Sequence, residues 1–337
     1  MKTALCFTPD LSFFRPAVFT AASLIGQGDA DAFDIFIVCE PADVAPGFER
    51  LDPALRRKIH LLEVDFSAFA RGLAGKGRFS KAVFRRLFLD LILPESYPRL
   101  IAIDADMRIA RPGLGRLAEI DLAGCPLAAA YDMIYLMDFR GGALAERFQT
   151  YRRSLGLDLE TPYFNAGLMV IDRATWRARD LGSRAAHALR ETPERYAFME
   201  QSALNSLIAG GFAPLSPRCN FMGDFFLLDL ETKIAPIVQH FVNSPKPWQF
   251  DLWRGEARFA LDYAGWFANS PWPDWPSPLR PERYRTRRPP LTATRRGFAE
   301  RLTAFLSTRR FADLAASAGE SGRMASAPLG DGEAGKS

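Results

Sequence analysis

The chain has 337 residues, of which 48% are hydrophobic and 24% charged, and its formal net charge is +4. This composition is ordinary for a globular protein with a sizeable core, organised as one large or two small domains. No run reaches the roughly 18 apolar residues that a membrane span needs. The four cysteines are widely spaced and lack a Cys-x-x-Cys pair, which favours reduced core residues and a cytoplasmic protein.

Short apolar runs rich in Phe, Ile and Val predict buried strands at residues 3–7, 33–39, 59–62, 100–103, 126–131, 167–171 and 234–241. Helical spacing predicts helices over residues 14–24, from Ser80 to Pro94, and over 174–189 and 199–208. Strands that alternate with helices indicate a Rossmann-like, mostly parallel α/β sheet flanked by helices.

The usual phosphate-binding loops do not follow the first strand, because neither Gly-x-Gly-x-x-Gly nor a Walker sequence occurs there. This excludes the common dehydrogenase and kinase classes. A bound diphosphate would have to be held by a metal ion and by side chains instead.

Composition changes near residue 250, and five of the six tryptophans fall between Trp248 and Trp275. Residues 251–293 are expected to form an irregular Trp- and Pro-rich extension that follows a domain over residues 1–250. Two interpretations stay open. The rings either pack on the sheet, or one or two of them line an acceptor groove, since sugars stack on aromatic faces.

The C-terminal part is strongly basic, with ten arginines against two glutamates between Arg280 and Arg310. Over residues 294–316 we predict a basic amphipathic helix with an apolar stripe. The helix either lies on an anionic membrane at the inner face of the plasma membrane, or docks on the body with a solvated basic face. Residues 317–337 are small, polar and Gly-rich, and are expected to be disordered.

Asp104-Ala105-Asp106 follows the buried run Leu100–Ile103 and is the most informative motif. Two carboxylates at a strand exit can bind one hard divalent cation, whose remaining ligands are commonly phosphate oxygens. The same tripeptide occurs at residues 29–31, but no strand precedes it there, so we expect a solvated turn.

Four segments together resemble glycosyltransferase family 8, whose members have a GT-A fold and transfer a sugar from a nucleotide sugar with retention. The first is Asp10-Leu11-Ser12-Phe13, where the family has Asp, Asn and Tyr; the resemblance implies that these side chains contact the nucleotide. The second is the helix that carries Arg86, which the resemblance places beside the donor and the metal-site carboxylates.

The third segment is Asp104-Ala105-Asp106 with the later Asp132, and the fourth comprises Phe164-Asn165-Ala166-Gly167 (the family's Phe-Asn-x-Gly), Glu200-Gln201, and His240 with Lys246. The resemblance implies that these two segments supply the metal and sugar sites. Asp104 and Asp106 would bind the metal, with His240 as a third ligand. The donor-contacting set implied by the family is Asp10, Ser12, Phe13, Arg86, Asp104, Ala105, Asn165 and Lys246. The side chains implied near the reacting sugar are Asp132, Glu200 and Gln201, with Glu200 standing where the family has Asp.

The resemblance therefore implies a metal-dependent retaining hexosyltransferase that uses Mn²⁺, with Mg²⁺ as an alternative, because mixed oxygen and nitrogen ligands suit manganese. The donor would be a UDP-sugar, and the acceptor a glycan or glycolipid of lipopolysaccharide or another surface polysaccharide. The alternatives are a nucleotidyltransferase and a non-catalytic nucleotide-sugar-binding protein. Nucleic-acid binding is not expected, since the arginines belong to no recognised module.

Overall fold

The computed structural model describes residues 2–75, 77, 80–275, 278–285 and 290–314. The tail predicted to be disordered, residues 317–337, lies outside these residues. At the centre is a seven-stranded sheet with the strand order β3-β2-β1-β4-β7-β6-β8. Its strands are β1 (Thr3–Phe7), β2 (Asp34–Cys39), β3 (Ile59–Glu63), β4 (Arg99–Ile103), β6 (Leu127–Tyr131), β7 (Phe164–Asp172) and β8 (Ala213–Leu215).

All neighbouring pairs in this sheet are parallel except those made by β7, which runs antiparallel to both β4 and β6. The prediction of a mostly parallel α/β sheet is therefore confirmed. A second sheet of three short strands has the order β5-β10-β9. It consists of β5 (Met107–Ile109), β9 (Phe221–Met222) and β10 (Val238–His240).

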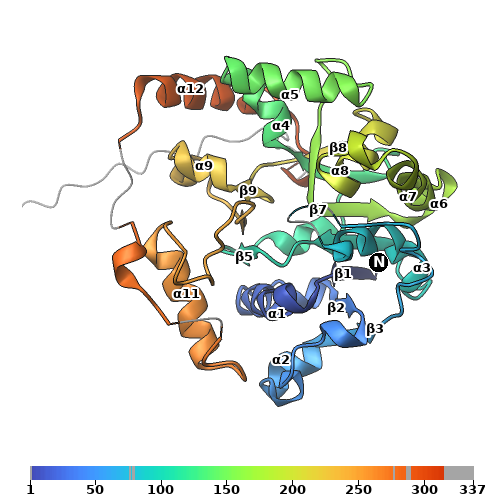
Figure 1. Cartoon of the computed structure of the whole chain (residues 1–337), viewed down its shortest axis with the longest axis vertical. Coiled ribbons are helices and arrows are strands. Elements are labelled where there is room, and N and C mark those ends of the chain that lie inside the picture. The colour runs from blue at the N-terminus through green and yellow to red at the C-terminus, as the bar shows by residue number, and fades with distance from the viewer. Residues whose placement is uncertain (1, 76, 78–79, 276–277, 286–289, 315–337) are drawn as a thin grey trace, which may run out of the picture.

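Helices cover both faces of the large sheet (Figure 1). The α-helices of the described residues are α1 (Leu11–Gly26), α2 (Pro53–Lys58), α3 (Leu89–Ile92), α4 (Met133–Leu136), α5 (Ala143–Ser154), α6 (Arg173–Ala178), α7 (Leu181–Glu191), α8 (Met199–Ile208), α9 (Gly223–Leu227), α10 (Glu231–Ile234), α11 (Ala257–Ala268) and α12 (Ala293–Ser307).

Three elements differ from the sequence-based prediction. The helix expected from Ser80 is a 3₁₀-helix over Lys81–Phe88 that continues as α3. The helix expected over residues 174–189 is divided into α6 and α7, because Asp180 adopts a left-handed conformation between them (φ 47°). The last strand begins only at Val238, since its expected start belongs to α10.

The alternation of side chains along each strand divides the core into two layers. Leu100 and Ala102 of β4 face the layer that contains α7, α8 and α12, whereas Ile101 and Ile103 face the layer of α1 and α11. Burial on both faces explains why these strands have continuous apolar sequences rather than an alternating pattern.

The C-terminal extension packs on the body. On α11, Tyr263 stacks on Phe19 of α1 with ring centroids 3.9 Å apart, and Phe267 is also buried. On α12, Phe298, Leu302 and Leu306 are buried in the core. Of the two interpretations of the basic helix, docking on the body accounts for its apolar stripe, which is therefore not available to a bilayer.

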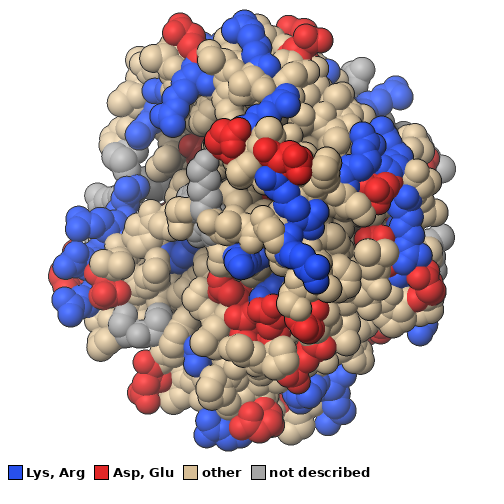
Figure 2. Space-filling view, turned by 45° about the vertical axis from the view of Figure 1, so that its right-hand side comes forward, with Lys and Arg blue, Asp and Glu red and all other residues tan. Residues whose placement is uncertain are grey.

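Charged side chains occur in several separate groups on the face shown in Figure 2, with acidic and basic groups interspersed. Among the described helices, none combines the length and the apolar character needed to cross a membrane.

Candidate active site

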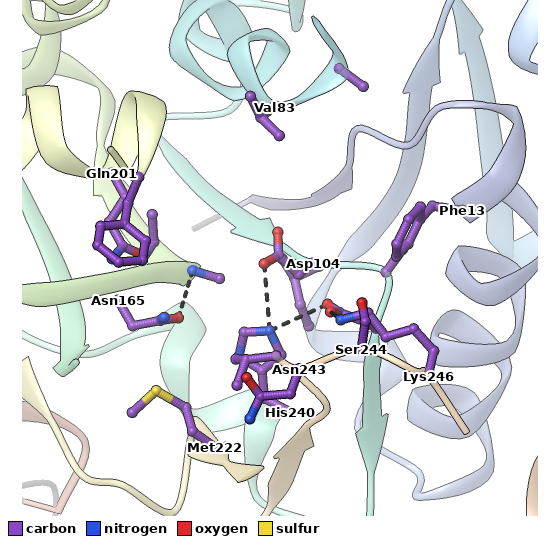
Figure 3. Close-up of a pocket in the computed structure, with 18 of the residues that line it drawn as sticks. Phe13, Val83, Asp104, Asn165, Gln201, Met222, His240, Asn243, Ser244 and Lys246 are labelled. Carbon is purple, nitrogen blue, oxygen red and sulfur yellow. Dashed lines mark hydrogen bonds and ion pairs between the residues drawn. The ribbon is translucent and has the colours of Figure 1, made fainter. Parts of the chain in front are cut away.

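A cavity of about 480 Å³ opens where β1, β4 and β6 end. All the residues that the sequence predicts for the site line it: Asp10, Ser12, Phe13, Arg86, Asp104, Ala105, Asp106, Asp132, Asn165, Glu200, Gln201, His240 and Lys246. In Figure 3, Asn165 and Gln201 lie on one side and Phe13 and Lys246 on the other, with Asp104 and His240 between them. The structure brings these residues together around one cavity, and their roles as site residues stay predictions.

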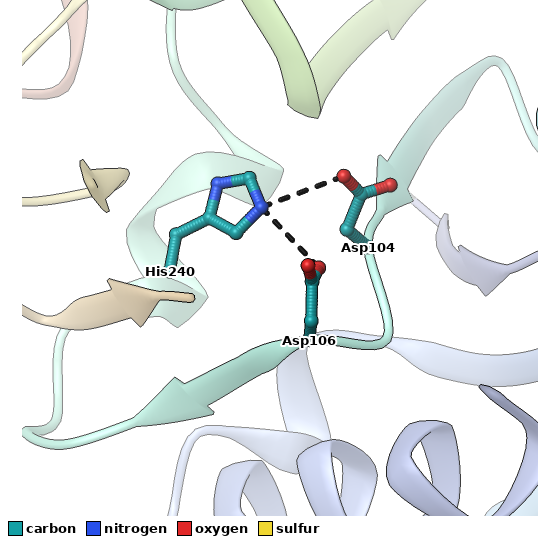
Figure 4. Close-up of side chains that lie close together, drawn as sticks. All are labelled: Asp104, Asp106 and His240. Carbon is teal, nitrogen blue, oxygen red and sulfur yellow. Dashed lines mark ion pairs between the residues drawn. The ribbon is translucent and has the colours of Figure 1, made fainter. Parts of the chain in front are cut away.

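Asp104, Asp106 and His240 converge at the base of the cavity. His240 Nε2 lies 3.6 Å from Asp104 Oδ2 and 3.3 Å from Asp106 Oδ1 (Figure 4). One potential ligand atom from each residue falls within 4.8 Å of the others. Two carboxylate oxygens and an imidazole nitrogen at this spacing fit a divalent cation.

The strand pairing explains why residues so distant in sequence meet. The chain turns after β4, where Asp104 N donates to Gly167 O at 2.7 Å, and continues into β5. Because β10 pairs antiparallel with β5, His240 lies opposite Met107. The imidazole is thereby fixed beside the acidic pair.

Two cations hold the acidic pair. Arg86 donates to Asp104 Oδ1 and to Ala166 O. Lys246 Nζ donates to Asp106 Oδ2 at 2.6 Å. Burial alone would raise the pKa of Asp106, but Lys246 and the protonated form of His240 outweigh this effect and hold the pKa well below its usual range.

Carboxylates and amides form the wall around Asn165. Asp132 Oδ2 accepts from Asn165 Nδ2 at 2.7 Å and from Gln201 Nε2 at 3.2 Å. Burial raises the pKa of Asp132, although these hydrogen bonds oppose it. Burial also raises the pKa of Glu200 to about 7, against the opposing effect of Arg86, whose Nε lies 3.6 Å from Glu200 Oε1.

The segment predicted to contact the nucleotide is also the N-terminus of α1. Asp10 Oδ1 accepts from the backbone N–H groups of Ser12 and Phe13, and from the Ser12 hydroxyl at 2.6 Å. Asp10 is therefore the N-cap of the helix as well as a lining residue. The ring of Phe13 packs edge-on against Trp248, with centroids 5.6 Å apart.

A family model described as "Glycosyl transferase family 8" matches residues 6–251, which is most of the chain. The chain belongs to glycosyl transferase family 8. The match confirms the predicted family and the prediction of an enzyme of the hexosyltransferase class. It gives no support to the nucleotidyltransferase or the non-catalytic alternative.

Curated relatives and solved structures agree with this assignment. General stress protein A of Bacillus subtilis (strain 168) is 26% identical over 226 residues, covering 62% of this chain and 74% of that protein. Lipopolysaccharide glucosyltransferase WaaO of Escherichia coli (strain K12) is 25% identical over 264 residues, covering 74% and 73%. The structure of the galactosyltransferase LgtC has a TM-score of 0.63 at 19% identity, covering 78% of this chain and 95% of that one, and confirms the GT-A fold.

Two features of this family 8 site were not predicted from the sequence. Asn220, which is fully buried, bonds both His240 Nδ1 and Asn165 Oδ1 at 2.8 Å. Gly167 leaves no room for a side chain, because a Cβ there would lie 2.4 Å from His240 Cε1 and 2.9 Å from Asp104 Oδ2. The Phe-Asn-x-Gly resemblance includes Gly167 without giving this reason, and no spacing signal marks Asn220.

A second hollow of about 380 Å³ adjoins the first and shares Asn243 and Ser244 with it. Its walls include Phe226, Trp253 and Phe259, and exposed Arg254 and Arg285 also line it. Of the tryptophans in the extension, Trp253 therefore lines a hollow, whereas Trp272 is buried. Packing on the body therefore holds for Trp272, and an acceptor groove lined by Trp253 stays a prediction.

Proposed function

We propose that this family 8 enzyme moves a hexose, with retention, from a UDP-sugar to a glycan or glycolipid acceptor. Asp104, Asp106 and His240 would hold a divalent cation, Mn²⁺ or alternatively Mg²⁺. The observation that carries the proposal is the convergence of these three side chains at the base of a cavity large enough for a nucleotide sugar.

The leaving nucleoside diphosphate develops negative charge on its β-phosphate. A bound divalent cation supplies Lewis acidity that stabilises this charge. Arg86 braces Asp104 and keeps its own positive charge, since the neighbouring carboxylates raise its pKa despite its burial. Lys246 Nζ donates to Asp106 Oδ2 and lines the same cavity, so its fixed positive charge would help to stabilise a diphosphate bound there.

For the chemical step we favour attack on the same face from which the diphosphate leaves, with that phosphate taking the acceptor proton. Glu200 is the alternative nucleophile. Because burial raises its pKa to about 7, a large fraction of Glu200 is protonated near neutral pH, and the ionised form is paired with the Arg86 guanidinium, so little free carboxylate is available to attack. Glu200→Gln should therefore keep near-normal turnover, and isolation of a glycosyl adduct on Glu200 would refute same-face attack.

The acceptor would enter from the second hollow, where aromatic walls suit the apolar face of a sugar. The relative WaaO is named as a lipopolysaccharide glucosyltransferase, which supports an acceptor in lipopolysaccharide or a related surface glycan. Trp253→Ala should raise the acceptor KM and leave donor hydrolysis unchanged; an unchanged acceptor KM would exclude this entry route.

Any contact with an anionic membrane would be electrostatic, because the apolar stripe of α12 is buried. Arg296, Arg309 and Arg310 are exposed and remain available for it. Changing these three to Gln should release the protein from anionic vesicles at low salt. Unchanged vesicle binding would exclude the basic segment as the tether.

The direct test of the proposed function is a screen of nucleotide sugars for Mn²⁺-dependent hydrolysis in the absence of acceptor. We expect turnover of one or a few UDP-sugars, which a chelator abolishes. If every nucleotide sugar were inert with and without Mn²⁺, and none bound, the proposal would be wrong.

A further inference from the structure

We infer that Asn220 is a positioning residue that selects the tautomer of His240, and that it joins the metal-binding side of the cavity to the donor-sugar side. The link to a metal rests on the proposed function, but the choice of tautomer rests only on hydrogen bonds within the chain.

The orientation of the Asn165 side chain is determined at both ends. A backbone N–H can only donate, and Gly167 N donates to Asn165 Oδ1 at 2.9 Å. The carboxylate of Asp132, when ionised, can only accept, and it takes a bond from Asn165 Nδ2 at 2.7 Å. A flipped Asn165 amide would lose both bonds.

The orientation of Asn220 follows from that of Asn165. Since Asn165 Oδ1 can only accept, the atom of Asn220 that faces it at 2.8 Å must be the Nδ2 donor. The Asn220 oxygen then faces His240 Nδ1, also at 2.8 Å. An amide oxygen only accepts, so Nδ1 must carry the proton.

A proton on Nδ1 leaves Nε2 of the neutral ring with its lone pair. Nε2 is the atom that faces the acidic pair, at 3.3 Å from Asp106 Oδ1 and 3.6 Å from Asp104 Oδ2. The ring is therefore prepared to ligate through Nε2, and Asn220 serves as the partner that fixes tautomer and ring plane.

The same bonds form a continuous chain across the site. It runs from His240 through Asn220 and Asn165 to Asp132, which also accepts from Gln201. Except for Gln201 these side chains are buried, with exposures of 7% or less, so water cannot readily replace a lost partner. A change at Asn220 should therefore affect both the metal ligand and the side chains predicted near the sugar.

Two substitutions separate the two halves of this role. Asn220→Leu is nearly isosteric and removes both bonds. Asn220→Asp keeps an acceptor for His240 Nδ1–H but sets a second oxygen against Asn165 Oδ1, so it breaks only the link to the sugar side. Ser202→Ala is the matched control, because Ser202 is also buried but bonds Tyr151 and Tyr163 rather than this chain.

The first measurement is the ¹⁵N NMR spectrum of the histidine side chains in metal-free protein, recorded at alkaline pH so that neutral imidazole rings are observed. The chain has only three histidines, and His60 and His187 are exposed, so His240→Gln assigns the remaining signals. We expect a protonated Nδ1 in the wild type, in Asn220→Asp and in Ser202→Ala. A protonated Nε2 in the wild type would overturn the inference, as would an unchanged spectrum in Asn220→Leu.

The second measurement is Mn²⁺ affinity by calorimetry. Loss of a ligand's hydrogen-bond partner should weaken binding about 10- to 100-fold in Asn220→Leu, and little in Asn220→Asp. Asn220→Asp should instead reduce kcat for donor hydrolysis at saturating Mn²⁺. Equal Mn²⁺ affinity and kcat in all variants would overturn the coupling.

Failure of the proposed function would look different. If the wild type bound neither Mn²⁺ nor a nucleotide sugar, the spectra of the metal-free protein would still decide the tautomer. If Asn220→Leu does not fold, Asn220→Asp remains decisive. Loss of the proton on His240 Nδ1 in that variant would contradict the inference.

Discussion

The tripeptide Asp-Ala-Asp occurs twice, at residues 29–31 and 104–106, in very different surroundings. In the second copy both carboxylates point at His240 and are held by buried cations. In the first copy, Asp29 Oδ2 accepts from the backbone N–H groups of Gly113 and Leu114, at 2.6 and 2.8 Å. Asp31 lies in solvent beside Lys58.

The two copies differ in what satisfies their charge. Hydrogen bonds from two backbone N–H groups stabilise the Asp29 carboxylate, and among the described residues only the second copy belongs to a group of three potential metal ligands. The expectation of a solvated turn is right for Asp31 and wrong for Asp29, which holds the segment after β5 in place. Identical residues therefore become a ligand pair only where the strand pairing brings a third ligand to them.

The largest contrast is expected from the same change made in each copy. Asp106→Asn removes a ligand charge and should abolish Mn²⁺ binding and lower kcat by about 10³-fold or more, since metal stabilisation amounts to several kcal/mol. Asp31→Asn should leave both unchanged. Steady-state kinetics with a Mn²⁺ titration measure this, and equal losses in the two variants would contradict the assignment.

Burial of Glu200 near the second copy should make the free energy of unfolding depend on pH. The pKa of Glu200 is raised from 4.5 to about 7, so the folded state holds a proton that the unfolded state releases. The resulting stability is fully present below pH 4.5 and is lost as the pH rises through 7, by about 3 kcal/mol in all.

In Glu200→Gln this contribution does not change with pH, because glutamine does not ionise. Relative to the variant, the wild type should therefore become less stable between about pH 4.5 and pH 7, as measured by denaturant unfolding with a chelator present. A difference in unfolding free energy that does not change over this range would show that Glu200 is not held in its protonated form.

Adding a methyl group at a glycine near each copy of the tripeptide also distinguishes the two copies. Gly167→Ala places a Cβ against His240 and Asp104 and should weaken Mn²⁺ binding about 10- to 100-fold, in line with the 1–3 kcal/mol typical of overpacking. Gly115→Ala brings its Cβ within 3.3 Å of Asp29 Oδ1 and Ala32 Cβ. It should affect thermal stability slightly and Mn²⁺ affinity not at all.

The smallest effect is expected at the first copy itself. Asp29→Ala removes two hydrogen bonds to backbone N–H groups and should lower the free energy of unfolding by about 1 kcal/mol, as loss of a helix cap does. Mn²⁺ affinity should stay at the wild-type value. Loss of Mn²⁺ binding in this variant would mean that the first copy contributes to the site after all.

Local sequence was sufficient for much of the fold. Residues 4–7 and 100–103 are apolar throughout because both faces of these strands are covered, and that pattern needs no tertiary knowledge. The antiparallel direction of β7 could not be predicted from the apolar pattern, since strand direction depends on the path of the chain that connects β6 to β7. Residues 132–161, which carry α4 and α5, form that connection and had no distinctive pattern.

The residues of the candidate site could likewise be predicted only in part from local sequence. Asp104 and Asp106 stand out because they follow a strand, and the resemblance to the family supplied His240 and Lys246. Asn220 gave no signal, because its two partners lie 20 and 55 positions away and only the pairing of β10 with β9 brings His240 near it. A buried amide is recognised by its neighbours rather than by its own segment.

The packing of the last two helices has a practical consequence for anyone dividing this protein. The family match ends at residue 251, yet Tyr263 and Leu302 lie in the same apolar layers as the first strand. A gene fragment that stopped at the match would leave both sides of the sheet partly bare, and its product should aggregate on expression. Chimeras that exchange acceptor preference with a relative will need to carry the chain through to Leu314.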